Sequence, residues 1–119
     1  MTRIAILCCE NIRDKSCIAC AKCFKAINEK AGTFKLIEDG IEVVGILGCG
    51  GCPGLHMPKI NLFETCLESL NMDFDKLFIG TCIITAIDFG NCPIEDYVTL
   101  KTMLENKLGK EVVLGTHPW

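Results

Sequence analysis

Short apolar runs recur along this sequence and alternate with longer segments in which apolar residues have helical spacing. The runs typical of buried strands are residues 3–7, 41–47, 77–80 and 111–114. Parallel strands need crossovers, usually helices, so this alternation favours a parallel sheet with helices on both faces. We therefore expect an α/β fold: a single three-layer domain over residues 1–119. Its central, mainly parallel sheet should have about four or five strands and be flavodoxin-like or Rossmann-like.

Three of the intervening segments are expected to form helices. The first runs from about residue 14 or 16 to 30, the second from 58 to about 71, and the third from 93 to 108. Pro58 and Pro93 suit first helical positions, with Asp96 in the first turn of the third helix, and Gly109 suits its end. Residues 33–38 are ambiguous between a short edge strand and an extended connection.

Apolar residues three or four positions apart indicate which helix faces are buried. The residues expected to face the core are Phe63, Cys66, Leu67 and Leu70 in the second helix, and Tyr97, Val98, Leu104 and Leu108 in the third. Cys66 is therefore assigned to packing rather than to a functional site.

Composition and charge exclude several classes of function. The net charge is −3 and Lys and Arg are scattered, so a surface for nucleic acid or an anionic membrane is not expected. No apolar segment reaches the roughly 18 residues of a membrane span, and the apolar run near the N-terminus is too short for a secretion signal. We therefore expect a cytoplasmic protein without a membrane or nucleic-acid partner.

Cysteine is the outlying residue type, with ten in 119 residues. The cysteines cluster at 8–9, 17–23 and 49–52, whereas structural disulfides usually join distant segments of secreted proteins. A reduced intracellular chain would use such clusters for metal binding or redox chemistry. We therefore expect functional thiols rather than a disulfide framework.

Candidate ligands follow the expected strands at their carboxyl ends. Cys8 follows the first strand, Cys49 and Cys52 the second, Cys82 the third and His117 the fourth. In open parallel sheets, ligands bind at this edge because the strand–helix loops and helix N-termini converge there. The pattern predicts that these side chains share one site.

Further cysteines lie near the expected helix N-termini and belong to the same rim. They are Cys17, Cys20 and Cys23 at the first helix and Cys92 at the third. Helix N-termini favour thiolates because they carry unpaired N–H groups and partial positive charge. Gly50 and Gly51 leave room for backbone N–H groups to face sulfur or a bound cofactor.

The segment Cys49-Gly50-Gly51-Cys52-Pro53-Gly54, placed after an apolar strand, resembles the signature of the CGGC domain family of small prokaryotic proteins. Cys8, Cys23-Phe24, Cys82, Cys92-Pro93 and Thr116-His117 extend the resemblance over essentially the whole chain. The resemblance implies metal binding, with zinc suggested, and no established reaction. It implies a site made of Cys8, Cys17, Cys23, Cys49, Cys52, Cys82, Cys92 and His117. This chain adds Cys9, Cys20 and Cys66.

The number of thiols bears on the choice of metal. One zinc ion takes four ligands and would leave at least half of these thiols unused, whereas an iron–sulfur cluster suits a sulfur-dominated rim. Dense, exposed thiols also suit an anaerobe, in which they rarely meet oxygen. We expect an iron–sulfur cluster in preference to zinc, in a redox, electron-transfer or metal-handling module with a protein redox partner.

Two alternatives stay open. A zinc-binding sensor or structural protein would perform no reaction. A metal-free thiol–disulfide oxidoreductase would use Cys49 and Cys52, because Cys-x-x-Cys between a strand and a helix resembles the thioredoxin-type motif. The sequence identifies no catalytic residue and leaves open whether the protein is an enzyme.

Overall fold

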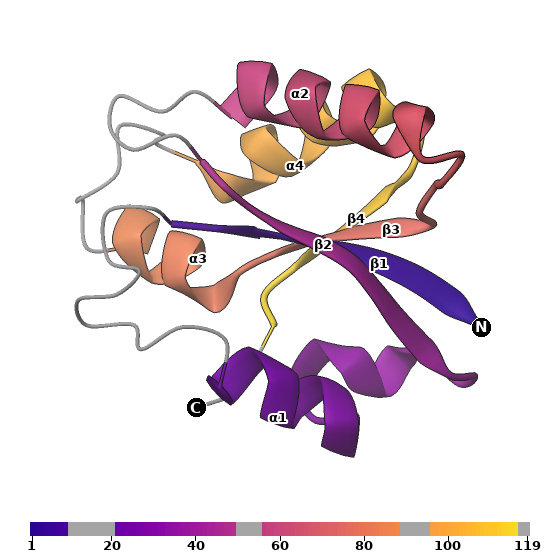
Figure 1. The fold of residues 1–119 in the computed structure, drawn as a ribbon. Helices are drawn as coiled ribbons and strands as arrows, with labels where there is room; N and C mark the ends of the chain where they lie inside the picture. The colour runs from indigo at the N-terminus through magenta and orange to yellow at the C-terminus, as the bar shows by residue number, and fades with distance from the viewer. Residues whose placement is uncertain (10–20, 50–55, 89–95, 117–119) are drawn as a thin grey trace.

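A computed structural model describes residues 1–9, 21–49, 56–88 and 96–116 of the chain (Figure 1). Strands and helices alternate along the described residues. The elements are β1 Thr2–Cys8, α1 Ala21–Glu29, the 3-10 helix η1 Gly32–Leu36, β2 Ile41–Gly48, α2 His56–Ser69, β3 Lys76–Ile79, α3 Thr81–Asp88, α4 Tyr97–Leu108 and β4 Glu111–Leu114. Among these helices, none is long and apolar enough to cross a membrane.

The described strands form a four-stranded sheet in the order β2-β1-β3-β4, and every pair of neighbours is parallel. The predicted α/β fold with a central parallel sheet is confirmed. Along the chain, β2 is added on one side of β1, and β3 and β4 on the other. This change of direction between β1 and β3 is the topological switch point of the sheet, where ligands of open α/β proteins bind.

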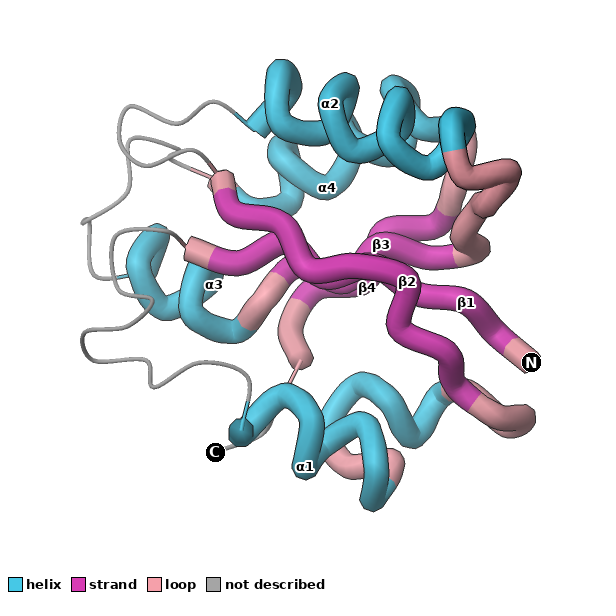
Figure 2. The backbone as a smooth tube through the Cα atoms, in the orientation of Figure 1, coloured by secondary structure: helices cyan, strands magenta, loops and turns pink. Residues whose placement is uncertain are grey.

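Alternate residues of each strand face opposite layers, as the pleat of a strand requires. Ala5, Leu7, Leu77 and Ile79 pack in one cluster with residues of α2, α3 and α4, whereas Ile4, Ile6 and Phe78 pack in a second with α1 and η1. Figures 1 and 2 show α2 and α4 on one side of the sheet and α1 on the other. The three-layer arrangement therefore follows from apolar side chains on both faces of the strands.

Aromatic packing fixes η1 against the sheet. Phe34 of η1 stacks on Phe78 of β3 with ring centroids 4.7 Å apart, and both side chains are buried. Burial of one such side chain stabilises the fold by about 1.5–3 kcal/mol. Residues 33–38 therefore contain a 3-10 helix rather than the expected edge strand or extended connection, because Phe34 reaches the core from a single helical turn.

The ends of α4 follow from local chemistry. Asp96 has an extended backbone, and its side chain accepts a hydrogen bond from the Val98 N–H at 2.9 Å, as a helix cap does. The third helix was expected to begin at residue 93, with Asp96 in its first turn. It begins at Tyr97, four residues later, with Asp96 as its cap, and residues 93–95 lie outside the described residues. Gly109 ends the helix with φ +66°, and its N–H donates to the Glu105 carbonyl at 2.8 Å.

Helix α3 was not expected, and it changes the place of Cys82. The Gly80 carbonyl accepts the N–H groups of Ile83 and Ile84 at 3.0 and 3.4 Å, which opens the first turn. Cys82, which was expected to follow the third strand, is therefore the second residue of a helix that begins soon after that strand. Ile83 and Ile87 are buried in the cluster on the α2 and α4 side of the sheet.

Three positions that were expected to face the core are exposed: one in α2, one directly after it and one in α4. Cys66 is exposed, Leu70 is 59% exposed and Val98 is 54% exposed. The buried residues of α2 are Ile60 and Leu67, seven positions apart on one face. Cys66 lies one residue, about 100° of helical rotation, away from Leu67. The assignment of Cys66 to the core was therefore wrong.

Candidate metal centre at the carboxyl edge of the sheet

Thiols follow three neighbouring strands at the carboxyl edge of the sheet. Cys8 is the last residue of β1, Cys49 comes directly after β2, and Cys82 follows β3 at the start of α3. The Cys49 N–H donates to the Cys8 carbonyl at 2.9 Å, which continues the strand pairing to the edge. Cys49 and Cys82 are half-buried and pack against the apolar cluster on the α2 and α4 side. The structure thus brings these candidate ligands to the predicted edge.

A backbone N–H group faces sulfur where β1 and β3 end side by side. The Cys9 N–H donates to Cys82 Sγ with a nitrogen–sulfur distance of 3.2 Å. Cys9 is buried directly after β1, so the bond joins the ends of two central strands across 73 positions of sequence. An amide donor stabilises negative charge on sulfur, and such bonds to sulfur tune thiolate-bound centres. The Cys82 sulfur is therefore placed at the switch point of the sheet.

Gly80 makes this placement of the Cys82 sulfur possible. A Cβ at position 80 would lie 3.1 Å from Cys82 Sγ and 3.0 Å from the Leu7 carbonyl oxygen. The Gly80 N–H also donates to the Leu7 carbonyl at 2.7 Å, which holds the loop against β1. A residue with a side chain would separate β1 from the start of α3.

A further thiol at this edge comes from α1, on the other side of the sheet. Cys23 Sγ lies 3.5 Å from Thr116 Oγ1, and Thr116 comes two residues after β4. Thr116 is buried, with 1% of its surface exposed, and its hydroxyl oxygen accepts the Thr81 N–H at 3.3 Å. Thr81 was not predicted from the sequence, and Thr116 entered only through the resemblance to the CGGC pattern. The available signal was that each lies two residues after the end of a strand, β3 or β4.

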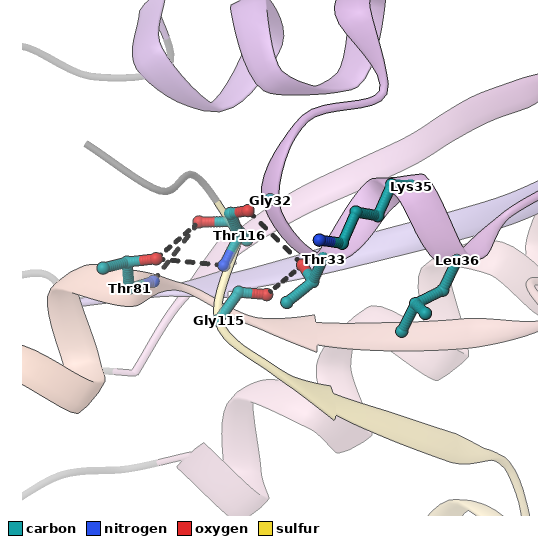
Figure 3. A pocket seen from close by; sticks show the side chains of 7 residues that line it. All are labelled: Gly32, Thr33, Lys35, Leu36, Thr81, Gly115 and Thr116. Carbon is teal, nitrogen blue, oxygen red and sulfur yellow. Dashed lines mark hydrogen bonds between the residues drawn. The ribbon is translucent and has the colours of Figure 1, made fainter.

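A pocket of about 330 Å³ opens beside this threonine pair (Figure 3). It is lined by Gly32, Thr33, Lys35, Leu36, Thr81, Gly115 and Thr116. Thr33 Oγ1 donates to the Gly115 carbonyl at 2.7 Å and to the Thr116 carbonyl at 3.3 Å, which ties η1 to the end of β4. The lining atoms are mostly carbon, so the pocket is not a further cluster of metal ligands.

The remaining predicted site residues belong to the parts of the chain outside the described ranges. They are Cys17, Cys20, Gly50, Gly51, Cys52, Cys92 and His117. Within residues 1–9, 21–49, 56–88 and 96–116, no three Cys, His, Asp or Glu side chains gather closely enough to hold a metal ion. The ligand set and its location therefore stay a prediction.

Comparison with known families agrees with the signature read from the sequence. The CGGC domain model matches residues 3–117. The chain belongs to the CGGC domain family. The resemblance inferred from Cys49-Gly50-Gly51-Cys52 is thereby confirmed. This CGGC-domain protein is 32% identical over 119 aligned residues to an uncharacterised protein of Methanocaldococcus jannaschii, with 97% of this chain and 86% of that protein covered. No solved structure matches the chain.

Proposed function

We propose that this CGGC-domain protein binds a metal centre through cysteine sulfurs at the carboxyl edge of the sheet. The observation that carries the proposal is the hydrogen bond from the Cys9 N–H to Cys82 Sγ. It lies at the switch point between β1 and β3, the position at which open α/β sheets bind ligands. Cys8 and Cys49, at the ends of β1 and β2, would supply further sulfurs at the same edge.

The residues present fit a thiolate-bound metal. Cysteine sulfur is a soft ligand, suited to zinc or to the iron of an iron–sulfur cluster. The amide donor on Cys82 Sγ and the hydroxyl beside Cys23 Sγ would offset the negative charge that several thiolates bring together. Cys8, Cys23, Cys49 and Cys82 would contribute ligands from described positions. Cys17, Cys20, Cys52, Cys92 and His117 would supply the rest, with the Gly50 and Gly51 N–H groups facing the centre.

An iron–sulfur cluster is the centre that we propose, and zinc is the alternative. Ten cysteines exceed what one tetrahedral zinc ion uses. A bound cluster would supply electron transfer, so the protein would be a redox or metal-handling module with a protein redox partner. This chain's own groups would hold the cluster, donate hydrogen bonds to its sulfur ligands and, through the apolar packing of Cys49 and Cys82, shield one side from water.

Metal and sulfide analysis of protein purified without oxygen tests the proposal. We expect iron and acid-labile sulfide in similar amounts, with brown colour that bleaches on reduction. If the analysis finds zinc and no sulfide, the metal is zinc rather than an iron–sulfur cluster, and the proposed site stands. Protein that takes up neither metal, and forms a Cys49–Cys52 disulfide with a measurable potential, would overturn the metal proposal in favour of a thiol–disulfide oxidoreductase.

A further inference from the structure

Within the described part of the chain, Thr116 has a polar side chain that is fully buried, with 1% of its surface exposed. Burial of a hydroxyl is costly unless the group is hydrogen-bonded. Thr116 Oγ1 has three polar neighbours: the Thr81 N–H at 3.3 Å, Thr81 Oγ1 at 3.4 Å and Cys23 Sγ at 3.5 Å. The hydroxyl thus lies where α1, the start of α3 and the end of β4 meet.

The main chain of Thr116 is held on two sides. Its N–H donates to Thr81 Oγ1 at 3.0 Å, and its carbonyl accepts the Thr33 N–H at 3.4 Å and the Thr33 hydroxyl at 3.3 Å. Figure 3 shows these bonds converging on Thr116 from α3 and from η1. A group held in this way keeps its position, so it can hold a neighbouring side chain in turn.

The direction of the contact between Thr116 and Cys23 depends on the state of the sulfur. A hydroxyl has one proton to donate, and Thr116 Oγ1 already accepts the Thr81 N–H. A thiolate that binds a metal has lost its proton, so Thr116 must then be the donor in the 3.5 Å contact. A hydrogen bond to an ionised acceptor is stronger than one to a neutral hydroxyl, so donation to Cys23 Sγ is favoured over donation to Thr81 Oγ1.

We propose that Thr116 positions Cys23 as a ligand of the metal centre by donating its hydroxyl proton to Cys23 Sγ. The inference rests on the proposed function, because it requires metal at this edge. Cys23 comes from the α1 side of the sheet, whereas Cys82 begins a helix whose buried residues pack on the opposite side. Thr116 therefore ties the thiol of one layer to the strand ends and to the first turn of α3.

Cobalt(II) added to reduced, metal-free protein under anaerobic conditions tests this role. Its affinity is measured by competition with a chelator, and its sulfur-to-cobalt absorption reports the thiolate ligands. Thr116→Val, which keeps the shape and removes the hydroxyl, is expected to weaken cobalt binding about tenfold or more. It should also move the sulfur-to-cobalt band to longer wavelength, because sulfur without a hydrogen bond gives up its electrons more easily. Thr116→Ser should restore both values.

Matched variants separate this role from a structural one. Thr33→Val removes a hydroxyl that bonds the Gly115 and Thr116 carbonyls rather than sulfur, so its loss of cobalt affinity should be clearly smaller than that of Thr116→Val, and the sulfur-to-cobalt band should not move because Thr116 keeps its hydroxyl. In a Cys23→Ser background, Thr116→Val should cause no further loss of affinity, because the sulfur it acts on is gone. Thr116→Ala replaces Thr116→Val in each comparison where the valine variant does not fold.

Failure of the inference and failure of the proposed function give different results. Loss of affinity in Cys23→Ser, together with parent-like affinity and spectrum in Thr116→Val, overturns the role of Thr116 and leaves the metal site standing. Equal losses in Thr33→Val and Thr116→Val also overturn it, since folding alone would then explain them. A parent protein that binds no cobalt through sulfur overturns the proposed function and this inference with it.

Discussion

Gly80 and Cys82 lie so close together that a side chain at position 80 would crowd the Cys82 sulfur. A Cβ on residue 80 would be 3.1 Å from Cys82 Sγ, and 3.0 Å from the carbonyl oxygen of Leu7 on β1. The first contact is with a candidate ligand and the second with rigid backbone of the central strand. The approach of β1 to the start of α3 therefore depends on this glycine, and the position of the sulfur depends on that approach.

Gly80→Ala should lower both stability and metal content. The backbone must shift to relieve the contact with Leu7, at a cost of about 1–3 kcal/mol in the free energy of unfolding. The shift also separates Cys82 Sγ from the Cys9 N–H, so we expect less metal per chain. Thermal unfolding and metal analysis measure the two effects. Gly40→Ala is the control, because its Cβ would meet the flexible Met1 side chain at 3.4 Å; equal metal loss there would contradict the local explanation.

Cysteine variants distinguish the carboxyl edge from the rest of the surface. Cys82→Ser should lose most of the bound metal, because Cys82 lies at the switch point with an amide donor on its sulfur. The double variant Cys49→Ser, Cys52→Ser should do the same. Cys66→Ser should keep its metal, because Cys66 lies near the last turn of α2, which runs back from this edge. The metal content of each variant, purified without oxygen, measures these effects. Metal loss in Cys66→Ser with retention in Cys82→Ser would place the centre elsewhere.

Gly45→Ala should affect the fold without affecting the site. A Cβ at position 45 would overlap the Phe63 ring, with Cζ 2.9 Å away, and Phe63 is held by Phe74 at a centroid distance of 5.7 Å. We expect a loss of about 1–3 kcal/mol in the free energy of unfolding, with unchanged metal stoichiometry. In the double variant Gly45→Ala, Phe63→Leu the losses should be less than additive, because the smaller side chain makes room. Strict additivity would show that the ring is not what the new methyl group meets.

The sheet was predictable from the sequence because its signals are local. The strands, of four to eight residues, are mostly apolar and place apolar side chains on both faces, so β1 to β4 were recognisable from short runs. The placement of Cys8 and Cys49 at one edge followed from parallel topology alone. Helix α3 was missed because its eight residues include Ile83, Ile84 and Thr85, β-branched residues that do not favour a helix.

The contacts within the candidate site were not predictable, because they join distant segments. Cys9 and Cys82 are 73 positions apart and Cys23 and Thr116 are 93 positions apart. Neither contact can be recognised from neighbouring residues in the sequence, since a threonine after a strand is common for conformational reasons alone. Topology predicts which loops meet at an edge, whereas the hydrogen bonds of a given sulfur depend on packing to within a few tenths of an ångström.

Acid should destabilise the metal-free protein through two carboxylates at the opposite edge of the sheet. The pKa of Asp73 is lowered by its hydrogen bond with Lys110, at 2.9 Å, and by the Phe74 N–H. The pKa of Asp39 is lowered by the Thr2 hydroxyl, at 2.6 Å, and by the N-terminal ammonium group. A carboxylate with a lowered pKa adds stability above its unfolded pKa of 3.8, and this stability disappears as the pH falls through the folded value.

We therefore expect the free energy of unfolding of the reduced, metal-free protein to fall as the pH drops below about 4. Asp73→Asn should be less stable than the parent at neutral pH, and the difference should shrink with acid, because the parent then loses the same interaction. Both carboxylates are exposed, so the effect is small and salt should reduce it. Denaturant unfolding between about pH 3 and 7 at two salt concentrations measures it. A difference between Asp73→Asn and the parent that grows as the pH falls would contradict the stabilising role of the Lys110 ammonium and the Phe74 N–H.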